Sequence, residues 1–314
     1  MARAFVCPGQ GAQSIGMGKA LAEAYVESKQ VFEEVDDALG ESLSKLIWEG
    51  DIDVLTLTEN AQPALMATSL AAARALTREG MGVETANYVA GHSLGEYSAL
   101  AIAGALSIAD AARLLRTRGK AMQAAVPVGV GAMAALLGLD FETASQVAKQ
   151  AAGDEVCEAA NDNDPAQVVV SGHKAAVERA VELAKEHGAK RAVLLPVSAP
   201  FHCSLMSPAA AVMKEALSEA TIISPSVPVV SNVKAQAVSD PDEIRELLIQ
   251  QITGSVRWRE SVMWMAQNDV SEIWEIGAGK ALSGMVRRID RDVECRNIAT
   301  PEDIRALSLS LIHI

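Results

Sequence analysis

The segment GHSLG, residues 91–95, constrains the fold of this chain more than any other segment. It fits the GxSxG pattern of a nucleophile elbow, in which a serine sits on a sharp turn between a strand and a helix. A short apolar run precedes it and a long helical pattern follows it, as that turn requires. The pattern predicts that Ser93 projects from the turn and that the unpaired N–H of Leu94 can face a developing oxyanion. A chance GxSxG in a glycine-rich chain is the alternative at this point.

Alternating strand and helix patterns around this motif predict an α/β fold. The expected large domain has a strand at 4–7, helices at 14–35, 64–79 and 94–125, and a strand at 88–90. Proline and glycines in VPVGVGA, residues 126–132, end this pattern.

A strand–helix–strand–strand–helix–strand series follows, which is the split motif of a ferredoxin-like subdomain. Its strands are expected at 133–139, 156–160, 167–171 and 191–195, and its helices at 142–152 and 174–187. We therefore expect an inserted subdomain at 127–197, within a large domain formed by 1–126 and 198–307. No role is assigned to the apolar tail, 308–314.

Composition excludes several classes of protein. Half of the 314 residues are hydrophobic, enough for one large core, and the excess of 40 acidic over 27 basic residues gives a net charge of −13. That charge argues against nonspecific binding to nucleic acid or to an anionic membrane. The four cysteines lack metal-type spacing, and we expect no signal peptide or membrane span. A cytoplasmic protein with reduced thiols is expected.

The serine needs a base, because a hydroxyl is a weak nucleophile at neutral pH, and the chain has only five histidines. His187 ends a charged helix and His173 follows a turn glycine, so both are expected at the surface. His313 lies in the tail, and His92 lies on the strained turn, where its ring points elsewhere. His202, in LPVSAPFHC, is the best remaining base. A lone histidine of this kind is otherwise more often packed in a core.

Arg118 can reach the serine only if the helix that starts at the elbow is broken. About seven turns of straight helix would carry it far from the Ser93 hydroxyl. Gly104 and Ser107 supply a plausible break. On composition alone, a solvated basic face is the favoured interpretation of Arg113, Arg116 and Arg118.

These segments closely resemble the malonyl-CoA:acyl carrier protein transacylases of fatty-acid synthesis. The resemblance spans nearly the whole chain, in order, through FVCPGQGAQ, TENAQPAL, GHSLGEYSAL, RGKAMQ, AQVVVSG, VSAPFHC and EIGAGKALSGMVRR. The fold of this family, a hydrolase-like α/β core with a ferredoxin-like insert, agrees with the organisation predicted above.

The resemblance implies a role for each residue that matches a family motif. Ser93 corresponds to the acylated nucleophile and His202 to its base, while the main-chain N–H groups of Gln10 and Leu94 correspond to the oxyanion hole. Gln251, in LIQQITGSVRW, matches the residue whose main-chain carbonyl orients the histidine. The implied site is therefore a dyad without a carboxylate.

Substrate-binding residues are implied in the same way. Arg118 matches the arginine that holds the free carboxylate of malonate. Phe201 resembles the bulky residue of malonyl-selective acyltransferases, and Asn163 is assigned to the substrate site.

The implied partners are malonyl-CoA and an acyl carrier protein, with no nucleic acid and no membrane. Lys190 and Arg191 resemble positions near the phosphates of coenzyme A. Arg287 and Arg288 are assigned to a basic patch for the acidic carrier protein.

The implied reaction is ping-pong: the serine takes the malonyl group from coenzyme A and then gives it to the phosphopantetheine thiol of the carrier. We expect no metal site and no cofactor. A serine thioesterase or esterase is the first alternative, favoured if a carboxylate lies within hydrogen-bond reach of His202. A catalytically silent scaffold that binds the carrier is the second, and the intact Ser93 and His202 disfavour it.

Overall fold

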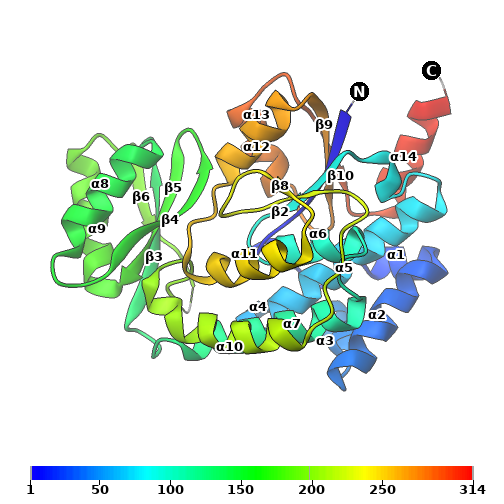
Figure 1. Ribbon diagram of the computed structural model, residues 1–314, viewed down its shortest axis with the longest axis horizontal. Coiled ribbons are helices and arrows are strands. Elements are labelled where there is room, and N and C mark those ends of the chain that lie inside the picture. The colour runs from blue at the N-terminus through cyan, green and yellow to red at the C-terminus, as the bar shows by residue number, and fades with distance from the viewer. Residues whose placement is uncertain (1, 198, 313–314) are drawn as a thin grey trace.

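The structure, a computed structural model, describes residues 2–197 and 199–312. It has a large unit built on a six-stranded sheet and a small unit built on a four-stranded sheet. Figure 1 shows the small unit, with α8 and α9, to one side of the large one. The expected α/β fold is confirmed.

The large sheet is parallel except at one edge. Its order is β10-β9-β1-β2-β7-β8, and only the short β7–β8 pair is antiparallel. The strands are β1 (Ala2–Cys7), β2 (Tyr88–Gly91), β7 (Val229–Val230), β8 (Ala237–Val238), β9 (Val270–Ile276) and β10 (Glu294–Ile298).

Both faces of this sheet are buried, because successive side chains of a strand point to opposite faces. In β1, Phe5 and Cys7 enter the main core, whereas Ala4 and Val6 enter a second core under α12 (Trp258–Gln267) and α13 (Ala281–Ile289). The other helices of the large unit contribute to the main core. They are α1 (Lys19–Ala24), α2 (Val26–Leu39), α3 (Leu43–Glu49), α4 (Ile52–Thr56), α5 (Thr58–Arg78), α6 (Gly95–Ile102), α7 (Ile108–Ala124), α10 (Ser207–Glu219), α11 (Pro241–Thr253) and α14 (Pro301–Ile312).

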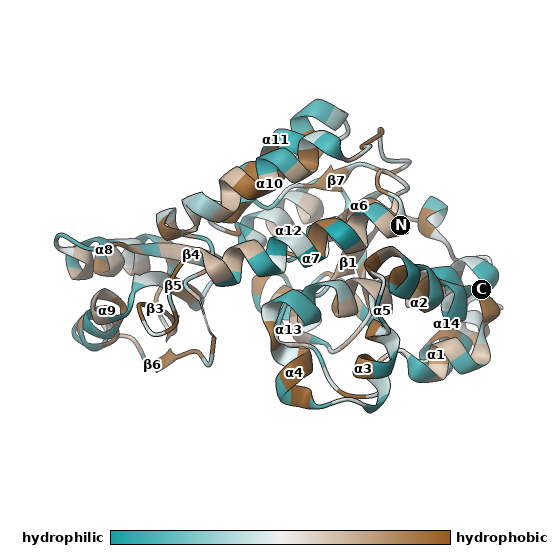
Figure 2. Cartoon of the chain, turned by 90° about the horizontal axis from the view of Figure 1, so that it is seen from below, coloured by the Kyte–Doolittle hydropathy of each residue, from teal (hydrophilic) through white to brown (hydrophobic). Residues whose placement is uncertain are grey.

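The small unit contains β3 (Gly131–Leu137), α8 (Phe141–Ala152), β4 (Cys157–Asp164), β5 (Gln167–His173), α9 (Lys174–Glu186) and β6 (Arg191–Leu194). This element order matches the segments expected between 133 and 195. The sheet order is β4-β5-β3-β6, with every neighbouring pair antiparallel. Ala134 and Leu136 of β3 face α8 and α9, whereas Met133 and Ala135 join the main core. Figure 2 shows these two helices on the outer side of the unit.

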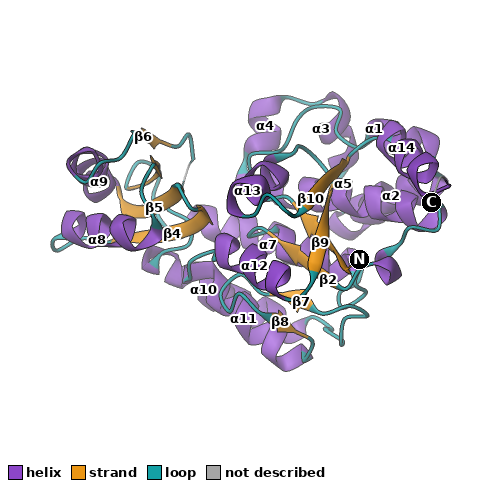
Figure 3. Cartoon of the chain, turned by 90° about the horizontal axis from the view of Figure 1, so that it is seen from above, coloured by secondary structure: helices purple, strands orange, loops and turns teal. Residues whose placement is uncertain are grey.

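Strand β4 connects the small sheet to the large unit. Asn161 forms an isolated parallel bridge with Val256, just before α12. The buried carboxylates of Asp162 and Asp164 pair with Arg259 of α12 and with Arg288 of α13 respectively. Figure 3 shows the two sheets separated, with α12 on the side of the large sheet that faces β4. These contacts fix the small unit against Val256, α12 and α13 of the large unit.

Several boundaries differ from those expected. The segment 14–35 holds two helices, α1 and α2, because Tyr25 is extended, and the segment 94–125 is interrupted between α6 and α7. Residues 308–312 continue α14, and 313–314 lie outside the described residues. Within the described ranges, none of the helices combines the length and the apolarity needed to cross a bilayer.

Candidate active site

Ser93 lies on a strained turn between β2 and α6. Its φ of 55° is in the left-handed region that non-glycine residues seldom adopt. The turn closes tightly, since a Cβ on Gly91 would lie 1.9 Å from the carbonyl group of Gly95, and one on Gly95 would lie 2.3 Å from the carbonyl oxygen of Cys7. The Asn232 side chain holds the turn, because its Oδ1 accepts from Ser93 N at 2.8 Å and its Nδ2 donates to the Gly91 carbonyl at 2.7 Å. The predicted elbow is present.

His202 faces the serine from the loop after β6. Its Nε2 lies 2.8 Å from Ser93 Oγ, and its Nδ1 lies 2.8 Å from the main-chain carbonyl oxygen of Gln251. A carbonyl can only accept, so Nδ1 carries the proton and Nε2 is free to accept the serine proton. Burial and, second, the positive charge of Arg118 lower the pKa of His202 to about 3, so the ring is neutral.

Arg118 reaches the same hydroxyl from α7. Gly104, at a φ of 74°, ends the turn after α6, and Ser107 caps α7 by accepting from Asp110 N. The chain thereby reverses, as the break in the helical pattern predicted, and Arg118 Nη2 donates to Ser93 Oγ at 3.0 Å. The guanidinium is 1% exposed, so the solvated-face alternative is wrong for this arginine.

Two glutamine side chains hold this guanidinium. Nη1 donates to Gln62 Oε1 at 2.8 Å, and Nη2 donates to Gln251 Oε1 at 2.9 Å. Burial lowers the pKa of Arg118, but an arginine starts high enough to stay charged. A fixed cation therefore stands beside the nucleophile, where a negatively charged acyl group could bind.

Two main-chain N–H groups are available to an oxyanion. Among the residues that the structure describes, neither Gln10 N nor Leu94 N donates a hydrogen bond. The Gln10 loop packs against the elbow, since a Cβ on Gly9 would lie 2.9 Å from the His92 carbonyl oxygen. Both donors thus come from segments that meet at Ser93.

The other residues predicted to bind the substrate, Phe201, Asn163 and Arg191, have different surroundings. Phe201 is buried in the main core next to His202. Asn163 Oδ1 contacts His92 Nε2 at 2.9 Å, so the His92 ring does point away from the serine. Arg191, like Lys190, is exposed at the edge strand β6.

Arg287 and Arg288 are both exposed, but Arg288 is engaged, because its Nε donates to the buried Asp164 at 2.7 Å. His187 is exposed as expected. The expectation for His173 is wrong: it is half-buried, because its Nδ1 accepts from Val156 N at 2.9 Å.

Three residues of the site were missed by reasoning from the sequence: Gln62, Glu96 and Asn232. Glu96 belongs to the segment GHSLGE, so its position one turn after the serine could have drawn attention to it. Gln62 belongs to the quoted segment TENAQPAL, but nothing in that segment marks it as a partner of Arg118, and Asn232 lies outside the quoted segments.

The comparisons with known proteins agree with this geometry. A family model described as "Acyl transferase domain" matches residues 4–276. The chain belongs to this acyl transferase family. Among its relatives, the malonyl CoA-acyl carrier protein transacylase of Bacillus subtilis (strain 168) is 48% identical over 302 residues, covering 96% of this chain and 94% of the relative. The Escherichia coli (strain K12) protein of the same name is 46% identical over 286 residues, covering 91% and 92%.

Solved structures of acyl transferases superpose on the whole chain. The acyl-carrier-protein-S-malonyltransferase from Bartonella henselae is 54% identical and covers 100% of both chains with a TM-score of 0.96. A malonyl-transacylase in complex with its type II PKS acyl-carrier protein is 39% identical, with a TM-score of 0.95 over 99% of this chain and 100% of the other. The resemblance seen in the motifs is therefore confirmed.

Proposed function

We propose that this acyl transferase moves the malonyl group from malonyl-CoA to the phosphopantetheine thiol of an acyl carrier protein, through an ester on Ser93. One observation carries the proposal: Ser93 Oγ lies 2.8 Å from His202 Nε2 and 3.0 Å from Arg118 Nη2. A nucleophile, its base and a buried cation thus meet at one atom. The names of the relatives and solved structures point to the same substrates.

The reaction has two balanced half-reactions. Ser93 Oγ attacks the thioester carbonyl while His202 Nε2 takes its proton, and the oxyanion accepts from Gln10 N and Leu94 N. The carbon–sulfur bond breaks, and His202 returns the proton to the thiolate of coenzyme A. The carrier thiol then gives its proton to His202 and attacks the ester. The carbon–oxygen bond to Ser93 breaks, and His202 returns the proton to Ser93 Oγ. Neither half-reaction changes an oxidation state, so no redox cofactor is needed. We propose that no metal takes part either, because His202 moves the proton and the N–H groups of Gln10 and Leu94 stabilise the oxyanion.

The acyl pocket is proposed to select malonyl by charge and shape. Arg118 binds the free carboxylate of malonate with two parallel donors, and Phe201 limits the space beside the α-carbon. Asn163, through His92, supports the elbow on the substrate side. Arg191, with Lys190, is proposed to meet the phosphates of coenzyme A.

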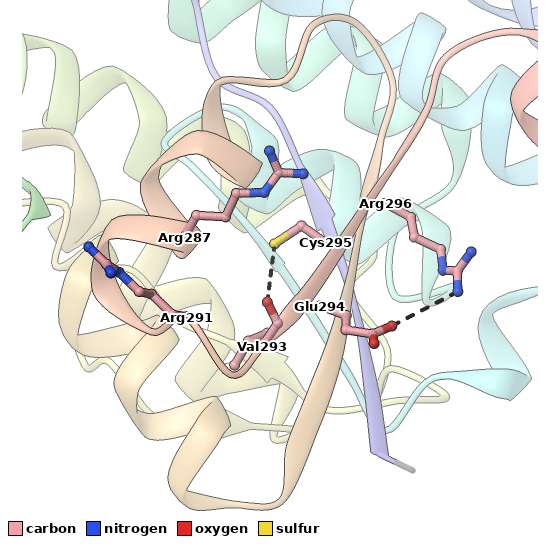
Figure 4. Close-up of a pocket in the computed structure, with 6 residues that line it drawn as sticks. All are labelled: Arg287, Arg291, Val293, Glu294, Cys295 and Arg296. Carbon is pink, nitrogen blue, oxygen red and sulfur yellow. Dashed lines mark hydrogen bonds and ion pairs between the residues drawn. The ribbon is translucent and has the colours of Figure 1, made fainter.

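Arg287 is the better-supported of the two arginines assigned to the carrier protein. It lines a surface pocket of about 560 Å³ with Arg291, Arg296 and residues of β10, as Figure 4 shows. In the described part of the chain, Arg287 and Arg291 form no ion pair. We propose that Arg287 attracts acidic residues of the carrier, and that Arg288, held by Asp164, contributes less.

The hydrolase alternative is less well supported, because the Nδ1 partner of His202 is the carbonyl of Gln251 and not a carboxylate. A silent scaffold would not need the contact between Ser93 and His202. We further propose the finer fold assignment: a hydrolase-like large domain, 1–126 and 198–307, with a ferredoxin-like subdomain, 127–197, and a cytoplasmic location. The β4-β5-β3-β6 order supports the ferredoxin-like assignment.

The proposal is tested by intact mass spectrometry. After incubation with malonyl-CoA, the protein should gain one malonyl group, and addition of a holo carrier protein should remove that group and malonylate the carrier. Ser93→Ala should gain none. A malonyl adduct on Ser93→Ala, or loss of the adduct to water alone, would contradict the proposal.

A further inference from the structure

The side chain of Gln251 lies between the guanidinium of Arg118 and the carboxyl group of Glu96. Its Oε1 accepts from Arg118 Nη2 at 2.9 Å, and its Nε2 donates to Glu96 Oε2 at 2.8 Å. The same Nε2 also lies 3.0 Å from the Ser93 carbonyl oxygen and 3.3 Å from Asn232 Oδ1, so Glu96 provides the shortest of three contacts that favour one orientation of the amide. Gln251 is 0% exposed and Glu96 is 2% exposed, so water cannot replace either contact. Glu96 itself touches neither Ser93 Oγ nor the base.

These two groups leave the amide only one favourable orientation. A guanidinium can only donate hydrogen bonds. Glu96 Oε2, which faces the N–H groups of both Gln251 and Asn232, acts as an acceptor whether or not the other carboxyl oxygen carries a proton. The amide oxygen of Gln251 must therefore face Arg118, and its NH2 group must face Glu96. In the reverse orientation, the NH2 group would oppose the donors of Arg118, and a carbonyl oxygen would oppose Glu96 Oε2.

Glu96 is itself held in place. Its Oε2 also accepts from Asn232 N at 3.1 Å, and its own N–H donates to the Ser93 carbonyl in the first turn of α6. Burial raises the pKa of the Glu96 carboxyl to about 7, although the hydrogen bonds from Gln251 and Asn232 act to lower that pKa. The carboxyl is thus fixed by the same segments that form the elbow.

We propose that Glu96 is a positioning residue for acyl selection: it orients the Gln251 amide, which holds the Arg118 guanidinium beside Ser93. The inference rests on the proposed function, because it concerns how the cation for the malonyl carboxylate is kept in place. The orientation of His202 depends on the main-chain carbonyl of Gln251, so it does not require this contact. Loss of the Glu96 acceptor should therefore affect malonyl more than acetyl.

Two substitutions by side chains of similar size separate the effect of the Glu96 hydrogen-bond acceptor from the effect of its side-chain volume. Glu96→Met removes the acceptor, whereas Glu96→Gln keeps an oxygen that can accept from Gln251 and Asn232. Single-turnover formation of the acyl-enzyme is measured by intact mass with malonyl-CoA and with acetyl-CoA. The malonyl-to-acetyl rate ratio should fall by roughly tenfold or more in Glu96→Met and stay within about threefold of the parent in Glu96→Gln.

Glu275→Gln is a matched control. Glu275 is also a buried glutamate that accepts hydrogen bonds, but its partners are Leu282, Ser283 and Asn297 around α13. Its substitution should leave the ratio unchanged, whatever it does to stability. If Glu96→Met does not fold, Glu96→Asp serves, because a side chain shorter by one methylene withdraws the carboxylate from Gln251 and should lower the ratio similarly.

The proposal is overturned if Glu96→Met keeps the parent ratio, or if both rates fall by the same factor, since the role would then be structural. It is also overturned if Glu96→Gln loses as much as Glu96→Met. Failure of the proposed function looks different, because the parent protein itself would then not be malonylated on Ser93.

Discussion

The guanidinium of Arg118 donates a hydrogen bond to the hydroxyl of Ser93, with Nη2 and Oγ 3.0 Å apart, although 25 residues separate them. The hydroxyl can accept this bond and still donate its own proton to His202 Nε2. A positive charge at this place attracts a negatively charged acyl group. It also disfavours a second positive charge on His202. The contact thus couples the nucleophile, the base and the acyl-binding cation.

His202 should stay neutral throughout the working range of pH. Burial, with the charge of Arg118 as the second cause, lowers its pKa to about 3, whereas a free histidine titrates near about 6.5. In an NMR titration, the ring resonance that disappears in His202→Asn should not shift between about pH 5 and 8. A midpoint near 6.5 for that resonance would show that the ring is solvated.

Phe201 should discriminate against a branched acyl group. A pocket that excludes one methyl-sized group discriminates between two substrates by about 1–3 kcal/mol of transition-state free energy. We therefore expect kcat/KM for malonyl-CoA to exceed that for methylmalonyl-CoA by roughly tenfold or more. Phe201→Ser should relax this preference, and Phe141→Ser, at the start of α8 in the small unit, should not. Equal turnover of both substrates by the parent protein would remove the argument.

Arg287 should matter for the carrier protein and not for malonyl-CoA. Arg287→Ala should raise KM for the carrier several-fold, more at low salt than at high salt, because exposed charges act through a screened field. The rate of malonyl-enzyme formation should not change. Arg305→Ala is the control, since Arg305 is an exposed arginine of α14 that pairs with Glu302. Equal effects of both substitutions would argue for a general charge effect.

The elbow could be predicted from the sequence because its determinants are local. Gly91 and Gly95 lie two residues either side of Ser93, and the close approaches that they permit follow from one short turn. The reversal that brings Arg118 back also has local causes, Gly104 and the Ser107 cap. Such features depend on backbone geometry, which a short segment determines.

The supporting network could not be predicted in this way. Gln62, from α5, and Asn232, after β7, meet the elbow only because the large sheet and its helices pack together. The strands β7 and β8 have two residues each, too few to show an alternating pattern. The pairing of Arg288 with Asp164 likewise requires the position of the small unit, so reasoning from the sequence placed Arg288 at the surface, where it lies, without its partner.

Removal of the Arg118 guanidinium gives the sharpest prediction. Malonyl differs from acetyl by a carboxylate, and burying that charge is costly unless a cation pairs with it. Loss of one partner of such a pair typically costs about 2–5 kcal/mol, so Arg118→Ala should slow malonyl transfer by roughly 100-fold or more. Acetyl transfer should hold steady or rise, because an uncharged acyl group no longer shares the pocket with a buried cation. The rates of malonyl transfer and of acetyl transfer are measured in separate assays with malonyl-CoA and with acetyl-CoA.

Arg116→Ala is the matched control for this prediction. Arg116 lies two residues before Arg118 on α7, and its guanidinium binds Asn60 and Glu41 instead of Ser93. Its loss should leave the malonyl-to-acetyl ratio unchanged. Arg118→Lys should recover only part of the malonyl rate, since an ammonium cannot offer two parallel donors to a carboxylate. If malonyl and acetyl rates fell by equal factors in Arg118→Ala, the arginine would stabilise the elbow through Ser93, Gln62 and Gln251, and acyl selection would have to arise elsewhere in the pocket.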